Sequence, residues 1–144
     1  REICYKCLRA KENCFCRYIR RIDSGVKFIF LMHTKEAKRQ RTGTGRLASL
    51  SLAESEIITG IDFSENARIK SLLSDERYFP LVLYPGEDAW TAQKAGFSEE
   101  IGRKTLLVFV IDATWFCAKK IIKLNPWLTT LPKLSFSGNY TSIF

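Results

Sequence analysis

The stretch that decides the fold is a run of six apolar residues followed by an acid, and it reads Leu106-Leu107-Val108-Phe109-Val110-Ile111-Asp112-Ala113-Thr114-Trp115. A run without polar alternation is typical of a strand that is buried on both faces of a sheet. Such strands belong to α/β proteins, whose ligands bind just beyond the carboxyl ends of the strands. Asp112, Thr114 and Trp115 stand at that position, and we therefore expect them to be functional residues.

The rest of the chain alternates between strand and helix patterns. Apolar runs predict strands at 26–32, 56–61, 81–84 and 105–111, with a further strand opening within 132–136. Helical patterns cover 47–53, a segment capped by Ser64, and 115–123, which Asn125-Pro126 ends. Residues 33–46 are polar and basic and read as a loop. The alternation predicts an α/β fold with a mostly parallel sheet flanked by helices.

Composition and charge narrow the class of protein. The chain has 144 residues, of which 46% are hydrophobic, enough for one folded domain and too many for a disordered chain. A net charge of +8 favours a polyanionic partner, with nucleic acid first and an acidic membrane surface second, although a basic protein without such a partner stays open. No apolar stretch approaches the ~20 residues of a membrane-spanning helix.

Neither end of the chain reads as a signal peptide or as the natural end of a folded element. No signal peptide is visible, so we expect a cytoplasmic protein that does not enter a membrane. The chain begins at Arg1 and finishes on Ser142-Ile143-Phe144, which reads as an element cut short. We therefore expect residues to be missing at both ends.

Four of the five cysteines lie within the first sixteen residues, as Cys4-x-x-Cys7 and Cys14-x-Cys16. Two close pairs of thiols suit a tetrahedral zinc site, and four thiolates would leave no open position, so we expect a structural metal. Disulfides or free thiols are the alternative, although nothing else in the chain suggests secretion. We expect residues 1–22 to form a small zinc-binding appendage and residues 23–144 the catalytic domain.

Three loops follow strands and are expected to converge on one pocket. They are Thr42-Gly43-Thr44-Gly45-Arg46, Tyr84-Pro85-Gly86 and the segment from Asp112 to Trp115. Glycines allow positive φ or a close approach of the backbone, and they leave amides free to bind an anion. Three plainer readings stay open: the glycines only form a tight turn, Asp112 caps the next helix, and Trp115 is a core residue. His33, the single histidine, reads as a local hydrogen-bonding residue rather than a base.

These motifs together resemble the DTW-domain family. The resemblance rests on Asp112-x-Thr114-Trp115, the ordered cysteine pairs and Thr44-Gly45-Arg46-Leu47, and it covers the chain from Cys4 to about Pro132. It implies a tRNA-uridine aminocarboxypropyltransferase, which uses S-adenosylmethionine (SAM) to place an aminocarboxypropyl group on N3 of a uridine. It also implies a SPOUT-like fold, in which the chain is knotted, a rare exception to unknotted topology.

The resemblance suggests a role for each candidate residue. Asp112 either accepts the uracil proton or holds the ammonium group of SAM, and Trp115 either stacks on a base or walls the pocket. Thr114 either binds the amino acid tail or caps the helix. Residues 42–46 are expected to bind the carboxylate of the tail, whereas Tyr84, Pro85 and Gly86 are expected to border the adenosine.

Two dense groups of cations suit contact with the phosphate backbone of RNA, although a solvated surface is the better reading for any one lysine. They are Arg17, Arg20 and Arg21, and Lys35, Lys38, Arg39 and Arg41. For the group from Lys35 to Arg41, beside the expected cofactor loop, we favour RNA. Two other functions stay open: a zinc-stabilised RNA-binding module without catalysis, and a SAM-dependent RNA methyltransferase.

Overall fold

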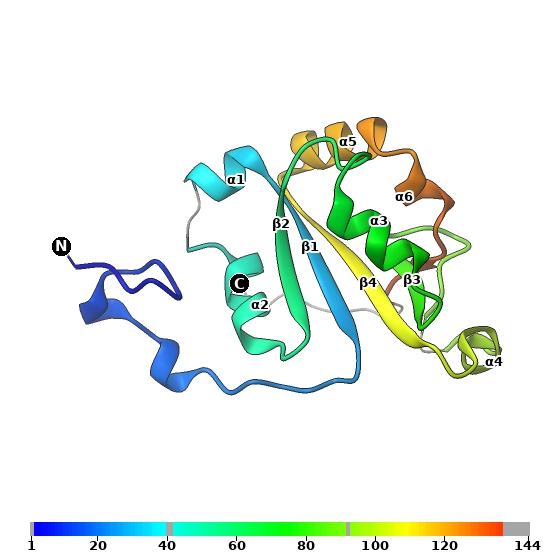
Figure 1. Cartoon of the computed structure of the whole chain (residues 1–144), viewed down its shortest axis with the longest axis horizontal. Helices are drawn as coiled ribbons and strands as arrows, with labels where there is room; N and C mark the ends of the chain where they lie inside the picture. Colours follow the sequence, from blue (N-terminus) through cyan, green and yellow to red (C-terminus); the bar gives the residue numbers. More distant parts are fainter. Residues whose placement is uncertain (1, 40–41, 92, 137–144) are drawn as a thin grey trace.

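The computed structural model describes residues 2–39, 42–91 and 93–136, and Arg41 among the expected cations lies outside them. Its centre is a five-stranded sheet in the order β2-β1-β4-β3-β5, and every neighbouring pair of strands is parallel (Figure 1). The strands are β1 (Lys27–His33), β2 (Ser55–Gly60), β3 (Tyr78–Leu83), β4 (Thr105–Asp112) and β5 (Lys133–Leu134). This confirms the predicted α/β class with a parallel sheet.

Six α-helices connect the strands within the described residues. They are α1 (Thr34–Arg39), α2 (Thr44–Ser51), α3 (Ala67–Ser74), α4 (Phe97–Ile101), α5 (Trp115–Leu124) and α6 (Trp127–Thr130). Two 3-10 turns, η1 (Lys11–Asn13) and η2 (Cys16–Tyr18), lie in the amino-terminal segment. None of the helices described is both long and apolar enough to span a membrane.

Helices cover the two faces of the sheet unequally. Side chains that alternate along β1 and β4, such as Leu31 and Phe109, form the main core with residues of α3, α5 and α6. Their strand neighbours Phe30 and Val110 point to the other face, where they share a pocket with α2. The central strands are therefore buried on both faces, as the apolar run of β4 predicted.

The centre of the sheet holds the point at which the chain changes direction. β1 and β4 are neighbours, but the chain leaves β1 towards β2 and leaves β4 towards β5 on the opposite side. In open α/β sheets, such a reversal creates a crevice beyond the carboxyl ends of the two strands. Asp112 pairs with Met32 in the register of β4 and β1, so it stands at this crevice.

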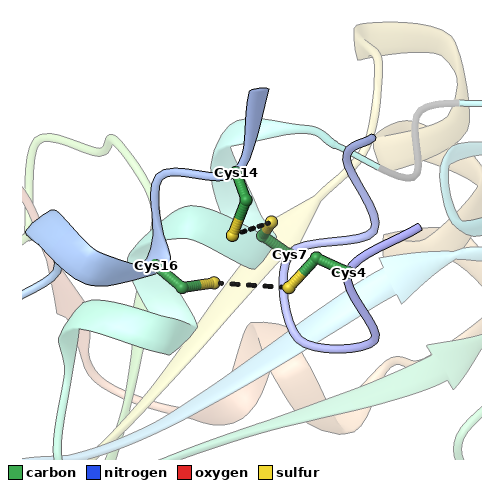
Figure 2. A group of neighbouring side chains, drawn as sticks. All are labelled: Cys4, Cys7, Cys14 and Cys16. Atoms are coloured by element: carbon green, nitrogen blue, oxygen red, sulfur yellow. Dashed lines mark hydrogen bonds between the residues drawn. The ribbon is translucent and has the colours of Figure 1, made fainter. Parts of the chain in front are cut away.

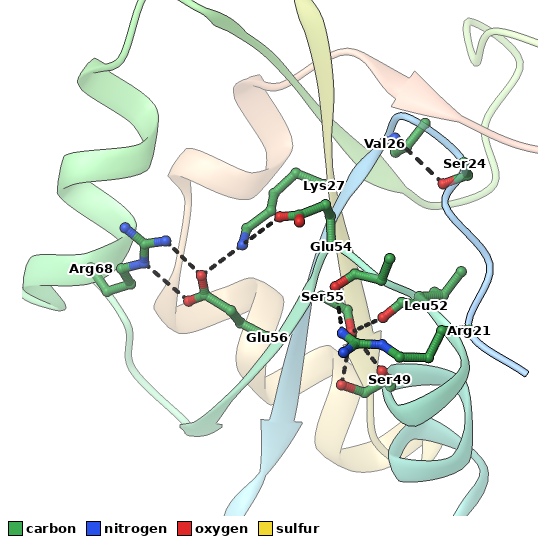
Figure 3. Close-up of polar contacts among 11 residues, drawn as sticks. Arg21, Ser24, Val26, Lys27, Ser49, Leu52, Glu54, Ser55, Glu56 and Arg68 are labelled. Carbon is green, nitrogen blue, oxygen red and sulfur yellow. Dashed lines mark hydrogen bonds and ion pairs between the residues drawn. The ribbon is translucent and has the colours of Figure 1, made fainter. Parts of the chain in front are cut away.

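Polar side chains tie the elements together away from that crevice. Glu56 of β2 accepts hydrogen bonds from Arg68 of α3 at 3.0 and 2.5 Å and forms an ion pair with Lys27 of β1 at 2.8 Å (Figure 3). Hydrogen bonds from Arg68, assisted by Lys27, lower the pKa of Glu56 to about 2. Arg21 donates to the Ala53 carbonyl at 2.8 Å, which joins the amino-terminal segment to the loop before β2.

A buried asparagine closes the end of α5. Asn125 is fully buried and donates to the carbonyls of Ile61 and Ile121, at 2.8 and 2.7 Å. Its Oδ1 accepts from the backbone N–H of Phe63 at 2.7 Å. The predicted helix end at Asn125-Pro126 is confirmed, and the same side chain also fastens α5 to the loop after β2.

Several predicted boundaries were wrong. Residues 33–46 are not one loop, because His33 belongs to β1, α1 follows it and α2 begins at Thr44 rather than at residue 47. Ser64 does not cap α3; Asn66 does, because its side chain accepts from the N–H of Ile69. The third strand begins at Tyr78, and α4 was not predicted. The described residues show neither a knot nor a SPOUT arrangement, so both stay predictions.

Candidate functional site

The carboxylate of Asp112 lies against the backbone of α2. Gly45 is buried, and a methyl group built on its Cα would lie only 2.0 Å from Oδ2 of Asp112. Real Cβ atoms do not approach other atoms so closely, so only glycine fits at this place. The close approach explains why one glycine stands in the first turn of a helix, where it weakens helix formation. Gly45 and Asp112 thus form one unit.

A pocket of about 180 Å³ surrounds this pair. Phe30, Val110 and Ile111 supply apolar walls from β1 and β4, and Ala48 closes it from α2. Thr44 and Asp112 contribute the polar side chains. The pocket therefore combines apolar walls with one carboxylate at the carboxyl edge of the sheet, which is where α/β proteins bind their ligands.

The surroundings of Asp112 make its proton affinity unusual. Burial raises the pKa of its carboxyl above the ordinary value, and the negative charge of Glu36 raises it further. Among the described residues, no hydrogen bond reaches the Asp112 side chain. A half-buried carboxylate without an internal donor can accept a proton or an ammonium group from a ligand.

The predicted glycine loop is the start of a helix. Gly43 occupies the N-cap position of α2 with φ −65°, and Thr44, Gly45 and Arg46 form the first turn. Neither Gly43 nor Gly45 adopts positive φ. Of the two reasons for a glycine that the sequence offered, the close approach of the backbone is therefore the one that applies, and it applies at Gly45. The first amides of an α-helix have no partner within the helix and favour negative groups. The segment 42–46 therefore offers backbone donors beside the pocket.

Thr114 and Trp115 begin α5 directly after Asp112. Thr114, not Asp112, occupies the N-cap position, and its side chain makes no capping hydrogen bond. The reading of Asp112 as a helix cap was therefore wrong. Trp115 is 74% exposed, so it is not a core residue, and it is not among the residues that line the Asp112 pocket.

The four amino-terminal cysteines converge on one point (Figure 2). All four Sγ atoms lie within 4.8 Å of one another, and the Cys4–Cys16 and Cys7–Cys14 pairs are each 3.8 Å apart. A tetrahedral zinc ion with Zn–S bonds of ~2.3 Å places its sulfurs about 3.8 Å apart. A disulfide needs about 2.05 Å, and all the cysteines are free. The donor set fits a closed, structural zinc site.

The surroundings favour a thiolate at Cys4 and disfavour one at Cys16. The amides of Cys7 and Lys6 lower the pKa of Cys4 to about 6, whereas burial and the neighbouring thiols raise the pKa of Cys16 to about 12. Leu8 adopts φ 59°, rare for a residue with a side chain, and its N–H donates to the Cys4 carbonyl at 2.8 Å. Four thiols at this spacing cannot all ionise without a cation between them.

Comparison with known families decides what kind of protein this is. The family model described as DTW domain matches residues 1–144. The chain belongs to the DTW domain family. This is the family of tRNA-uridine aminocarboxypropyltransferases, and it is associated with tRNA modification. No solved structure matches the chain.

In this DTW domain, the predicted loop Tyr84-Pro85-Gly86 lies on the other side of the sheet from the Asp112 pocket. Tyr84 lines a smaller pocket of about 100 Å³ with Ile122 of α5 and Leu128 of α6, whereas Pro85 and Gly86 are exposed. The structure thus brings Thr44 and Gly45 to Asp112 and leaves segment 84–86 apart. The other predicted site residues of segments 42–46 and 112–115 do not line the Asp112 pocket. Ile111 lines both pockets, so the two lie back to back at the end of β4.

The histidine of the DTW domain behaves as the sequence predicted. His33 is buried, and its Nδ1 accepts the N–H of Lys35 at 3.1 Å. Burial lowers the pKa of its imidazole below the ordinary value, and the charges of Lys35 and Lys120 lower it further. His33 therefore stays neutral and orders the turn from β1 into α1.

Sequence reasoning missed part of the site. Glu36 acts on the charge of Asp112, and Phe30 and Ala48 form pocket walls. A helix starting at Thr44 would have placed Ala48 one turn beyond Gly45 on the same face, so a correct helix start was the signal that could have found it.

Proposed function

We propose that this DTW domain transfers the aminocarboxypropyl group of SAM to N3 of a uridine in tRNA. One observation carries the proposal: the Asp112 carboxylate and the first turn of α2 meet in a pocket at the point where the sheet reverses direction. This places an acceptor and a set of backbone donors side by side. An amino acid tail, with its ammonium and carboxylate groups, needs both.

The pocket suits the tail in size and chemistry. Its volume of about 180 Å³ is smaller than the ~300 Å³ or more of a pocket for a drug-sized ligand, so it suits the short amino acid tail rather than the whole of SAM. In this proposal the amides and side chains of 42–46 hold the carboxylate, and Thr114 binds the tail beside Asp112. Contact between the adenosine and Tyr84, Pro85 and Gly86 stays a prediction from the sequence, because these residues do not line the Asp112 pocket.

The sulfonium of SAM supplies a carbon that is already activated for displacement. A bond forms between uracil N3 and that carbon, the C–S bond breaks, and its electron pair leaves with methylthioadenosine. The imide proton of uracil must leave as the new bond forms, and Asp112 accepts it. The raised pKa of Asp112 makes it a better base than an ordinary aspartate. By binding the amino acid tail, the pocket also determines which of the three carbons bonded to sulfur is attacked.

The other features of the chain fit an RNA substrate. The net charge of +8 favours a polyanion. The four cysteines hold zinc as a structural ion, in an appendage at 1–22 that precedes the catalytic domain at 23–144. The closed donor set leaves the ion no position for substrate, so transfer depends on the pocket at Asp112.

The test incubates the full-length protein with SAM and unmodified tRNA and then analyses the nucleosides by mass spectrometry. We expect uridine to gain the mass of an aminocarboxypropyl group, with methylthioadenosine as co-product. A gain of one methyl group, with S-adenosylhomocysteine, would instead show a methyltransferase. Binding of tRNA without any mass change would show a passive RNA-binding module, and either result would overturn the proposal.

Asp112→Asn tests the role of the base. We expect the transfer rate to fall by about 10²- to 10⁴-fold while SAM still binds, because an amide cannot accept the proton. In the wild type, the rate should rise with pH through a pKa above that of ordinary aspartate, since only the deprotonated carboxylate is active. Loss of SAM binding in the variant, measured by calorimetry, would instead assign Asp112 to the ammonium group.

A further inference from the structure

Helix α5 exposes an unusual combination of side chains. Trp115 and Phe116, in its first turn, are 74% and 78% exposed. Lys119, Lys120 and Lys123 follow on the exposed side, whereas Cys117 and Ile121 point into the core. Large aromatic side chains are rarely left so open, and here two of them adjoin cations. Within the described part of the chain, this side of α5 therefore faces solvent.

Helix α1 extends this surface with more positive charge. Lys35, Lys38 and Arg39 are exposed, and Glu36, the acid of this helix, is half-buried towards Asp112. The two helices follow the carboxyl ends of neighbouring strands, because α1 comes after β1 and α5 after β4. Lys35 of α1 and Lys120 of α5 are both close enough to act on the charge of the His33 imidazole. Figure 1 shows both helices at the carboxyl end of the sheet. We call the exposed residues of the two helices the α1–α5 face; they are Lys35, Lys38, Arg39, Trp115, Phe116, Lys119, Lys120 and Lys123.

We propose that the α1–α5 face is the docking surface for tRNA, with a base stacked on Trp115 or Phe116 and phosphates on the lysines. Aromatic rings beside a positively charged track are what single-stranded nucleic acid requires, since bases stack on the rings and cations follow the backbone. Helix α5 carries no acidic residue, so its charge complements a polyanion along its whole length. This inference rests on the proposed function for the identity of the RNA.

The position of the face also explains how a uridine reaches Asp112. Asp112 ends β4 and Trp115 begins α5, so only two residues along the chain separate the pocket from the stacking platform. A nucleotide held beside Trp115 is within reach of the pocket once it leaves its stack, which loops and flipped bases permit. In this arrangement the indole positions RNA at the rim rather than lining the pocket.

The test measures tRNA binding without SAM, so it does not depend on turnover. Phe116→Ala should weaken binding of unmodified tRNA by about 5- to 150-fold, and Phe116→Tyr should restore it, because any aromatic ring stacks. The pair Lys119→Ala and Lys123→Ala should reduce the slope of log affinity against log salt by about 1.5. The matched control is the pair Arg103→Ala and Lys104→Ala, exposed cations that precede β4 at the opposite end of the strand, which should leave the slope unchanged.

Fluorescence gives a direct view of the platform. Trp115 is much more exposed than Trp90 and Trp127, so iodide should quench it first, and tRNA should protect it. A Trp115→Phe variant assigns the signal. If Trp115 is already shielded from iodide in the free protein, another segment of the chain or a second copy covers the face, and the inference is overturned. The same holds if the variants lose binding to phosphatidylserine vesicles but not to tRNA.

The outcomes separate this inference from the proposed function. Loss of tRNA affinity in Phe116→Ala, with no aminocarboxypropyl transfer by the wild type, would support the docking surface and overturn the reaction. Normal transfer by the wild type, with unchanged tRNA affinity in Phe116→Ala and the α5 lysine pair, would support the reaction and overturn the docking surface.

Discussion

The amino-terminal segment and the sheet are held together by different means. Within residues 2–22, Cys7 is the single buried residue, and the segment contains only short turns. Within the sheet, side chains such as Leu31, Leu107 and Phe109 are fully buried and pack against three helices. The segment touches the sheet domain through Arg21 and Ile22, which bond to the residues around Leu52.

The amino-terminal segment shows how a stretch of chain that is too short to bury a core can still be stabilised. About twenty residues cannot remove enough apolar surface from water to offset the loss of chain entropy. Four convergent cysteines could hold a metal ion, and its binding would supply the folding free energy that apolar burial does not. The sheet domain is stabilised by its apolar core and needs no metal. Different changes should therefore unfold the two regions.

The largest expected effect comes from breaking the zinc site. Cys7→Ser should abolish stoichiometric zinc and unfold residues 2–22, whereas thermal unfolding of the sheet should change little. Metal analysis and limited proteolysis check this, with cleavage expected before residue 23. The control is Cys117→Ala, since Cys117 is buried in α5, away from the cluster, and the variant should keep its zinc. A folded and protease-resistant segment without metal would contradict the contrast.

The next effect concerns close packing inside the sheet domain. Gly45→Ala should destabilise the domain by about 1–3 kcal/mol, because the new methyl group overlaps the Asp112 carboxylate. In an Asp112→Ala background the same change should instead stabilise by up to about 1 kcal/mol, since alanine is the better helix former. Denaturant unfolding of the wild type, the two single variants and the double variant checks this. The same sign of effect in both backgrounds would rule out the close approach.

The smallest expected effect is electrostatic. Glu56→Gln should cost about 1 kcal/mol at neutral pH, discounted because Arg68 is 50% exposed. The pKa of Glu56 falls from 4.5 to about 2 on folding, so its contribution is complete above pH 4.5 and disappears as the pH falls towards 2. Unfolding at several pH values checks this. Glu65→Gln is the control, because Glu65 is 89% exposed in its ion pair with Lys70. This variant should change the free energy of unfolding little at any pH.

Patterns within a few neighbouring residues predicted much of this molecule. The run from Leu106 to Ile111 predicted a doubly buried strand, and the paired cysteines predicted a metal cluster, because both signals are local in the chain. The region 33–46 was misread as a loop, since its charges and glycines obscure two short helices. The cap of α3 was misplaced because Ser64 and Asn66 are equally good caps by residue type, and only the geometry chooses Asn66.

The sequence by itself determined the class of fold, the family, the cysteine ligands and the strand end that carries Asp112. Only the tertiary structure decided which residues meet there. It placed Gly45 against Asp112, put Tyr84 on the other face of the sheet, turned Trp115 to solvent and set the buried Asn125 among four hydrogen-bonding partners. The physical reason is that strand and ligand patterns repeat over a few residues. Contacts between β1, β4, α2 and α5 depend instead on sheet order and on the face to which each side chain points.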